Sequence, residues 1–294
     1  METWLFLALL APLFYALSNM VDKFLLDKRV KYCFALAPIS GLCALVFGVI
    51  TFFFISFKDI PQTQLIVAFL LGLGIALNYV LYYYALSFEE VSRVVSIWYL
   101  SPVFVLLFAT VFLGEHLPLL KIFAVLLAVS GAVLIGFEKF DRGFVMRRAF
   151  YWVLFNCLLA AVITTVQKYL LGGMAFWNLF CLQSFGLFVG LSLTLFSGRV
   201  RAHFGHVMKS VHLVIVTEVL TFVAAIIFLS AMSRAEVAKV SALSSVQPIY
   251  LLILMLISSL FIPHILKEEF TRRSFAIKVI SVLMVVVGAY FIAV

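Results

Sequence analysis

Charged residues are scarce in this sequence, and their scarcity excludes a water-soluble globular protein. Only 12% of the 294 residues are charged and 66% are hydrophobic, with a mean hydropathy of +1.22. Average soluble domains contain about a quarter charged residues. We therefore expect an all-α membrane protein, because β-barrel strands would give short alternating stretches and not long apolar runs.

Cysteine pairs and common enzyme motifs are also missing. His203 and His206 have a ligand-like spacing but lie in a basic segment without an acidic or cysteine partner. No G-x-x-x-x-G-K-[ST] or G-x-S-x-G motif occurs. We expect no cofactor, metal site or catalytic residue, and an integral membrane enzyme finds little support. The four cysteines stand alone and indicate small core residues: Cys33, Cys43, Cys157 and Cys181.

Long apolar segments fill almost the whole chain. A membrane-spanning helix needs about 20 apolar residues. The first segment lacks a basic start and a small-residue cleavage site, so we expect it to be a retained span and not a signal peptide. Ten spans are expected, at residues 3–22, 33–56, 63–86, 91–113, 118–137, 149–170, 175–197, 210–232, 236–258 and 273–293.

The second half of the chain repeats the first. Residues 85–102 (ALSFEEVSRVVSIWYLSP) align without a gap with residues 231–248 (AMSRAEVAKVSALSSVQP). Five spans per copy is an odd number, so the second copy must enter the membrane from the opposite side. We therefore expect two inverted five-helix repeats, residues 1–138 and 149–294, joined by a charged linker at 139–148. Such repeats commonly hold a substrate site near mid-membrane between them.

Lys and Arg are distributed unevenly between the two sides of these spans. Of the 21 Lys and Arg residues, 16 lie in or beside the loops after the odd-numbered spans and 5 on the other side. The positive-inside rule favours a cytoplasmic location for the side with 16, with both termini outside a plasma or inner membrane. Anionic lipid beside these short loops explains the net charge of +8 without nucleic acid as a partner.

Several features, in their order along the chain, resemble one transporter family. They are the Ser18-Asn19 to Lys23 end of the first span, the Ala85-Leu86-Ser87 turn before a span with a central proline, and Phe112-Leu113-Gly114-Glu115 before a Gly/Ala-rich fifth span. Together with the two-copy layout, they resemble the EamA-type branch of the drug/metabolite transporter superfamily. The resemblance implies a secondary transporter whose central cavity is lined mainly by helices 1, 3, 4, 6, 8 and 9.

Two departures from the family pattern stand out. The second copy has Lys267-Glu268-Glu269, after an insertion, where the first has the Gly-Glu step. Members of the family also usually keep their termini cytoplasmic, whereas the count of Lys and Arg favours termini outside. The sequence therefore leaves the orientation open.

Pro102 and Pro248 occupy matching positions in the two copies, at the midpoints of the fourth and ninth spans. A mid-helix proline removes one backbone hydrogen bond, so the carbonyls of Trp98 and Ser244 are expected to lack their usual donor. We interpret the prolines as hinges beside the transport path; packed kinks are the alternative. Their neighbours would lie at the same depth as candidate substrate-binding groups: Trp98, Tyr99, Ser244 and Gln247.

Glu218 is the only carboxylate well inside a predicted span, about 10 Å along the eighth one at about 1.5 Å per residue. Polar groups inside a bilayer are costly, so its depth makes Glu218 a candidate for proton coupling. A position at the interface or a basic partner is the alternative. Asn19 and Asn78 are further substrate-binding candidates, although such residues more often hold helices together.

Aromatic residues gather on the third span. Tyr79 and Tyr82, together with Trp98 and Tyr99, could build a wall that suits organic cations or aromatic substrates. The 32 Phe and 11 Tyr residues of the chain also produce such clusters by chance. A role in substrate binding and a role in packing both stay open.

Small residues recur every fourth position on the fifth span and at matching positions of the tenth. They indicate close helix packing between the halves or between subunits, which leaves a homodimer open. The residues are Ala124, Ala128, Ala132 and Gly136, with Ser281, Ala289 and Ala293.

Taken together, the sequence predicts a secondary active transporter, or a facilitative exchanger, of a small organic metabolite such as an amino acid or organic cation. Inverted repeats with midplane prolines favour alternating access over a channel. A flippase for a lipid-linked substrate would use the same helices and is the closest alternative.

Overall fold

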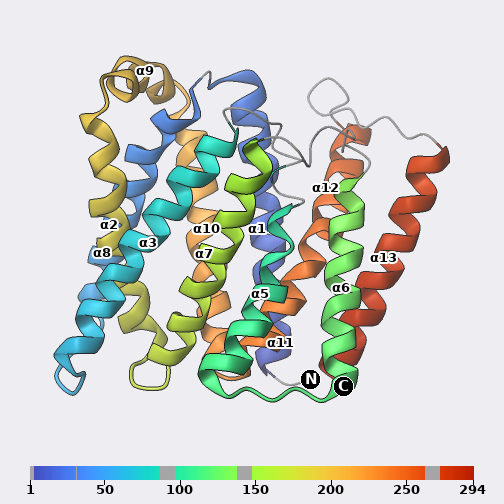
Figure 1. Ribbon diagram of the computed structural model, residues 1–294. Helices are drawn as coiled ribbons and strands as arrows, with labels where there is room; N and C mark the ends of the chain where they lie inside the picture. The colour runs from blue at the N-terminus through green and yellow to red at the C-terminus, as the bar shows by residue number, and fades with distance from the viewer. Residues whose placement is uncertain (1–2, 31, 87–93, 95–96, 138–147, 262–271) are drawn as a thin grey trace.

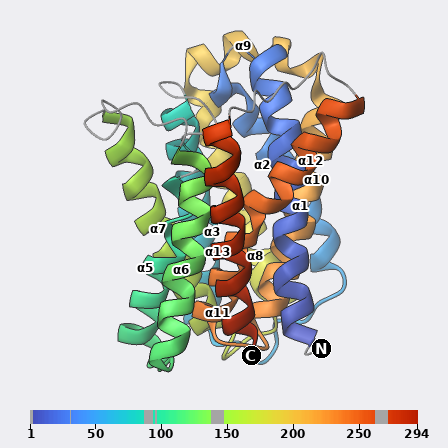
Figure 2. The same cartoon turned by 90° about the vertical axis from the view of Figure 1, so that its right-hand side faces the viewer.

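A computed structural model describes residues 3–30, 32–86, 94, 97–137, 148–261 and 272–294, which form a bundle of helices (Figures 1 and 2). Within these ranges no strand occurs, so the all-α prediction is confirmed. Seven of the described helices are long and apolar enough to cross a membrane. Three shorter apolar helices accompany them, at Ser101–Leu113, Leu119–Leu134 and Ile277–Ala293.

The N-terminal part of the bundle ends at residue 137. Apolar sequences form helices here because a bilayer offers no water to satisfy backbone groups. The elements are α1 (Thr3–Lys28), the 3₁₀ turn η1 (Cys33–Leu36), α2 (Ala37–Phe52), α3 (Gln62–Leu86), α5 (Ser101–Phe108), the π-helical turn η2 (Ala109–Leu113) and α6 (Leu119–Phe137).

The C-terminal part begins at residue 148, and the predicted linker lies almost wholly outside the described residues. Its elements are α7 (Arg148–Leu170), α8 (Phe176–Ser192), the 3₁₀ turn η3 (Leu193–Phe196), α9 (Gly198–Met208), α10 (Val211–Met232), α11 (Val237–Leu243), the 3₁₀ turn η4 (Ser244–Val246), α12 (Gln247–Phe261) and α13 (Arg272–Ala293). Most predicted spans overlap a described helix. The helix α1 continues past residue 22 to Lys28, α2 ends at Phe52 and not at 56, and the predicted fourth span (91–113) lies partly outside the described residues.

The two ends of the bundle differ. Both chain termini lie at one end, here called the lower end, and α9 lies across the other, here called the upper end (Figures 1 and 2). The sequence analysis treated α9 as a loop, although Val200, Phe204 and Val207 repeat at helical spacing. Val200 and Val207 are buried, and α9 packs against η1. Its histidine His203 stacks on Tyr32, with ring centroids 5.1 Å apart.

Large apolar side chains face outward over much of the bundle. Phe54, Phe112 and Phe123 are 84%, 72% and 67% exposed. In water such a surface would favour aggregation, whereas lipid tails solvate it without cost. The exterior therefore fits a multi-pass membrane protein.

Small residues allow α6 and α13 to approach closely, as Figure 1 shows at the right of the bundle. A Cβ atom on Gly131 would lie 2.7 Å from the Ser281 carbonyl oxygen, and one on Gly288 would lie 2.7 Å from that of Ala124. Ala128 and Ala132 are buried in the same region. The predicted small-residue packing is therefore made within this chain, between its N-terminal and C-terminal parts.

Candidate functional site

Polar side chains join α1 to α10 in the interior of the bundle. The Ser18 hydroxyl lies 2.7 Å from the Thr221 hydroxyl and donates to the Thr217 carbonyl oxygen at 3.3 Å. The two helices pack along their length and run in opposite directions. One turn above Ser18, Asp22 therefore faces the turn of α10 that carries Thr217 and Glu218.

Glu218 is the centre of this polar group. Its side chain is 4% exposed, and its Oε1 accepts a hydrogen bond of 2.5 Å from the Ser40 hydroxyl on α2. Within the described part of the chain, its Oε2 has no hydrogen-bond donor. The Tyr83 hydroxyl on α3 lies within hydrogen-bonding reach of Ser40. Glu218 thus contacts α2 directly and α3 through one hydroxyl, with one buried acceptor unused.

Asp22 is a second interior carboxylate that the sequence analysis missed. Its side chain is partly buried, and it lies close enough to Glu218 for the two charges to interact. The predicted first span ended at this residue, but α1 and its apolar segment Thr3–Leu26 continue beyond it. The apolar run Phe24-Leu25-Leu26 was the signal that could have found it. The expectation that Glu218 is the only carboxylate inside a span is therefore wrong.

The predicted aromatic residues are partly brought together. The rings of Tyr82 and Trp98 lie 6.3 Å apart, and Tyr83 lies 5.9 Å from Tyr82 and 6.2 Å from Tyr79. Tyr79 and Tyr83 are also electrostatic neighbours of Glu218. Tyr99 packs in a small apolar cluster with Ala132, Ile249 and Val285, and it is an electrostatic neighbour of Tyr82.

The two asparagines proposed for substrate binding differ in their surroundings. Asn78 donates to the Asn156 carbonyl oxygen at 3.2 Å and so ties α3 to α7. Asn19 is partly exposed on α1, one residue from Ser18. The geometry gives Asn78 a packing contact, and it leaves Asn19 beside the Ser18 contact with α10.

The prolines do not lie in the middle of continuous helices. Pro102 is the second residue of α5 and Pro248 is the second residue of α12, where a helix needs no proline N–H. The turn η4 precedes α12, and the Gln247 N–H donates to the Ser244 carbonyl oxygen. The expectation of an unsatisfied Ser244 carbonyl is therefore wrong, because the chain breaks into two helices instead of kinking. Ser244 and Gln247 flank this break and are partly buried.

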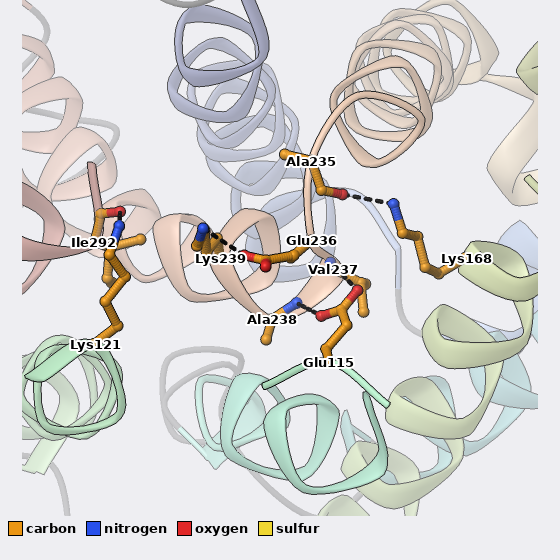
Figure 3. Close-up of polar contacts among 9 residues, drawn as sticks. All are labelled: Glu115, Lys121, Lys168, Ala235, Glu236, Val237, Ala238, Lys239 and Ile292. Atoms are coloured by element: carbon orange, nitrogen blue, oxygen red, sulfur yellow. Dashed lines mark hydrogen bonds and ion pairs between the residues drawn. The ribbon is translucent and has the colours of Figure 1, made fainter. Parts of the chain in front are cut away.

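Charged side chains cap helix ends at the lower end of the bundle (Figure 3). The Glu115 carboxylate accepts from the backbone N–H groups of Val237 and Ala238, at 2.8 and 3.2 Å, at the start of α11. Gly114 ends η2 with a φ of 67°, which turns the chain so that Glu115 follows. The family-like Gly-Glu step thus links the N-terminal part to the C-terminal part.

Lys168 makes a complementary contact beside Glu115. Its ammonium group donates to the carbonyl oxygens of Met232 and Ala235 at 2.7 and 2.6 Å, where α10 ends. Figure 3 shows the contact with Ala235. A cation at a helix C-terminus and an anion at a helix N-terminus both interact favourably with the helix dipole. The lower end is therefore joined by charge-assisted contacts.

Metal ligands are not gathered anywhere in the described ranges. No group of three or more His, Cys, Asp or Glu residues there could hold a metal ion. The polar group around Glu218 consists instead of two carboxylates, several hydroxyls and aromatic rings, and buried amides such as Gln167 and Gln183 lie elsewhere in the described bundle.

An apolar exterior and long apolar helices define a multi-pass helical membrane protein. The sequence profile of the EamA-like transporter family matches residues 2–137. This match places residues 2–137 in the drug/metabolite transporter superfamily. A comparison with curated proteins gave no match.

One solved structure, titled "Crystal structure of protein", has a similar fold. It superposes with a TM-score of 0.72 at 16% sequence identity, over 99% of this chain and 95% of that chain. At this identity the likeness establishes the fold alone. It extends the fold assignment over residues that the family profile does not match.

Proposed function

We propose that the protein is a secondary transporter, or a facilitative exchanger, of a small organic metabolite such as an amino acid or organic cation. The family match of residues 2–137 supports transport. The observation that carries the mechanism is Glu218, a carboxylate 4% exposed inside an apolar helix with one oxygen unpaired in the described structure. Burying a carboxylate in an apolar helix costs free energy. Binding of a proton or a substrate would explain why the carboxylate lies there.

Two inverted five-helix repeats, residues 1–138 and 149–294, would supply the alternating access. Helix packing supports this architecture. When each helix of a contacting pair is replaced by its equivalent in the other repeat, the new pair is also in contact. The pair α1 with α10 corresponds to α7 with α3, and α1 with α12 corresponds to α7 with α5. The pairs α2 with α8, α5 with α11 and α6 with α13 each join equivalent helices. A two-fold axis in the membrane plane would produce this exchange.

The movement would use the broken helices. In the second proposed repeat, α11, η4 and α12 form one crossing with a break before Pro248. The first repeat has the corresponding proline, Pro102, at the start of α5. Breaks of this kind concentrate a change of backbone angle in a few residues, so we assign the hinges to them. Ser244 and Gln247 lie beside the hinge and are our candidates for substrate contact there.

Proton coupling is assigned to Glu218, and its neighbours define what its ionisation would meet. The groups around it are Asp22 of α1, Ser40 and Cys43 of α2, and Tyr79 and Tyr83 of α3. The described neighbours include no basic side chain. An ionised Glu218 would therefore be stabilised chiefly by the Ser40 hydroxyl. Binding of a proton to the carboxylate would be the other way to offset the cost of burying its charge.

The test begins with a thermal-shift screen of purified protein against amino acids, amines, nucleosides, sugars and polyprenyl phosphates, since a ligand stabilises the state it binds. The best ligand is then followed in proteoliposomes with an imposed proton gradient. Glu218→Gln should abolish gradient-driven accumulation, whereas Asp59→Asn, at an exposed site between α2 and α3, should not. Undiminished accumulation by a folded Glu218→Gln variant would remove Glu218 from coupling. Stabilisation by polyprenyl phosphate alone would favour a lipid flippase.

A further inference from the structure

We propose that Asp22 and Glu218 together form a binding site for the ammonium group of an organic amine. The proposal rests on the proposed transport function and names the class of its substrate. Two carboxylates from different helices converge here: Asp22 on α1 and Glu218 on α10. Their spacing follows from the Ser18 contacts with Thr217 and Thr221, which fix the register of the two helices one turn below.

The two carboxylates have no counter-ion among the described residues. Lys168 and Lys239 lie at the lower end, where Lys168 binds carbonyl groups and Lys239 pairs with Glu236. Neither Asp22 nor Glu218 has a Lys or Arg among the described groups that act on it. Two like charges in an apolar interior are unfavourable unless protons or a cation neutralise them. The pair therefore has the electrostatics of a cation site.

Hydrogen bonding points to a ligand with N–H donors. Glu218 Oε1 is used by Ser40, but Oε2 is buried without a donor in the described structure. An unsatisfied buried acceptor is destabilising, and a bound donor would remove that cost. A primary ammonium group carries three N–H donors and a positive charge. It could donate to Oε2 and to the Asp22 carboxylate at the same time.

Aromatic rings beside the pair favour an organic cation over a metal ion. Tyr79 and Tyr83 neighbour Glu218, and Tyr82 connects them to Trp98. Aromatic faces attract an ammonium group and pack against the apolar part of its molecule. Calcium requires six to eight oxygen ligands. Two carboxylates with two or three hydroxyls do not supply a coordination shell of that size and charge. The same two carboxylates would hold protons when the amine is absent.

Binding to purified protein in detergent tests the site directly. Three molecules of similar shape serve as probes: phenethylamine, the neutral 2-phenylethanol and the anionic 3-phenylpropionate, with putrescine and tetraethylammonium as further cations and sodium and calcium chloride as inorganic ones. We expect phenethylamine or putrescine to raise the melting temperature, and the alcohol, the anion and the inorganic ions to leave it unchanged. Tetraethylammonium should bind more weakly than the primary amines, because it has no N–H donor.

Variants then assign the binding to the two carboxylates. Asp22→Asn and Glu218→Gln should each weaken amine binding at least tenfold, whereas the matched substitution Asp59→Asn at an exposed site should leave it unchanged. Circular dichroism and gel filtration report whether each variant folds. If one of the two amide variants does not fold, Asp22→Glu serves as a further variant, because it keeps the carboxylate charge. Asp22→Glu should retain amine binding, and the amide variant that folds should lose it.

Several results would overturn the amine site. They are the absence of binding by every amine tested, equal stabilisation by 2-phenylethanol, and unchanged amine affinity in both folded amide variants. The proposed function fails differently. If Glu218→Gln loses gradient-driven accumulation of a substrate but keeps its exchange across the membrane, Glu218 couples protons without binding substrate. Transport would then stand and the amine site would be rejected.

Discussion

Ser40 matters at the scale of single residues because it is the hydrogen-bond donor that the structure gives to Glu218. Its side chain is fully buried, and the Leu36 carbonyl oxygen, 3.3 Å from its hydroxyl oxygen, is the alternative acceptor for its single O–H. A buried carboxylate without a donor is considerably less stable than one with a charge-assisted hydrogen bond. The Ser40 hydroxyl therefore stabilises the packing of α2 against the buried carboxylate of α10.

Replacement of this serine gives the prediction at this scale. Ser40→Ala should lower the free energy of unfolding by about 1–3 kcal/mol, because Glu218 would keep both oxygens buried without the hydroxyl. Reversible unfolding of the purified protein in mixed detergent measures the change. Ser56→Ala serves as the control, since the Ser56 side chain is exposed. Equal stability of the two variants would mean that the Ser40 contact contributes nothing.

Single residues were predictable where composition alone marked them. Glu218 stands out because it interrupts a long apolar run, and the structure buries it as expected. Asp22 was overlooked because it lies beside Lys23, at a position where a span of average length would end. The length of α1 depends on its packing against α10, which the sequence does not state. Ser40 and Thr221 were equally hidden, since an isolated hydroxyl in an apolar helix carries no signal of its partner.

At the scale of helices, the termini of α10 and α11 depend on side chains from other elements. Glu115 binds the first N–H groups of α11, and Lys168 binds carbonyl groups where α10 ends. The helix α11 has only 7 residues, so its own hydrogen bonds leave most of its N–H groups without partners. An external cap therefore has a large effect on this element.

Removal of that cap should destabilise the lower end of the bundle. Glu115→Ala should lower the free energy of unfolding by about 0.5–2 kcal/mol, the usual range for loss of an N-cap. Glu115→Gln should cost less, because an amide keeps one acceptor oxygen. Hydrogen exchange should increase at the amides of Val237 and Ala238 and stay constant in α2. Unchanged exchange at these two amides would contradict the role of Glu115 as a cap.

Helix positions were predicted better than helix interruptions. Hydropathy located the crossings, because apolar length is written directly in the sequence. The position of the break before Pro248 was predicted as a kink, since the proline rule does not say whether a chain bends or begins a new helix. The short 3₁₀ turn Ser244–Val246 is the structural difference, and it satisfies the carbonyl that a kink would leave free.

At the scale of the whole molecule, the two ends of the bundle hold their positive charges differently. Lys28 and Arg29 at the end of α1, with Arg199 and Arg201 on α9, are exposed at the upper end. At the lower end, Lys58 is exposed, but the other positive groups bind protein atoms: Lys121 to the Ile292 carbonyl, Lys168 to two carbonyls, Arg234 to that of Ser230, and Lys239 to Glu236. Charge available to lipid and to the insertion machinery is therefore concentrated at the upper end.

This difference strengthens the expectation that the upper end is cytoplasmic. The C-terminal residue Val294 is 78% exposed at the lower end, and Gly205 on α9 has no atom within 4 Å of the position where a Cβ would lie. A cysteine added after Val294 and the substitution Gly205→Cys therefore place one thiol at each end without a steric cost. Cys33, Cys43, Cys157 and Cys181 are first replaced by serine or alanine so that each variant carries one thiol.

An impermeant thiol reagent applied to intact cells distinguishes the two orientations. If the distribution of Lys and Arg governs insertion, the thiol after Val294 should react at once, and Gly205→Cys should react only after the membrane is permeabilised. The opposite pattern would give the orientation usual in the family, with both termini cytoplasmic, and the amine site near Asp22 would then lie closer to the outer face. Reaction of both thiols from outside would contradict the arrangement in which α9 and the C-terminus lie at opposite ends of the bundle.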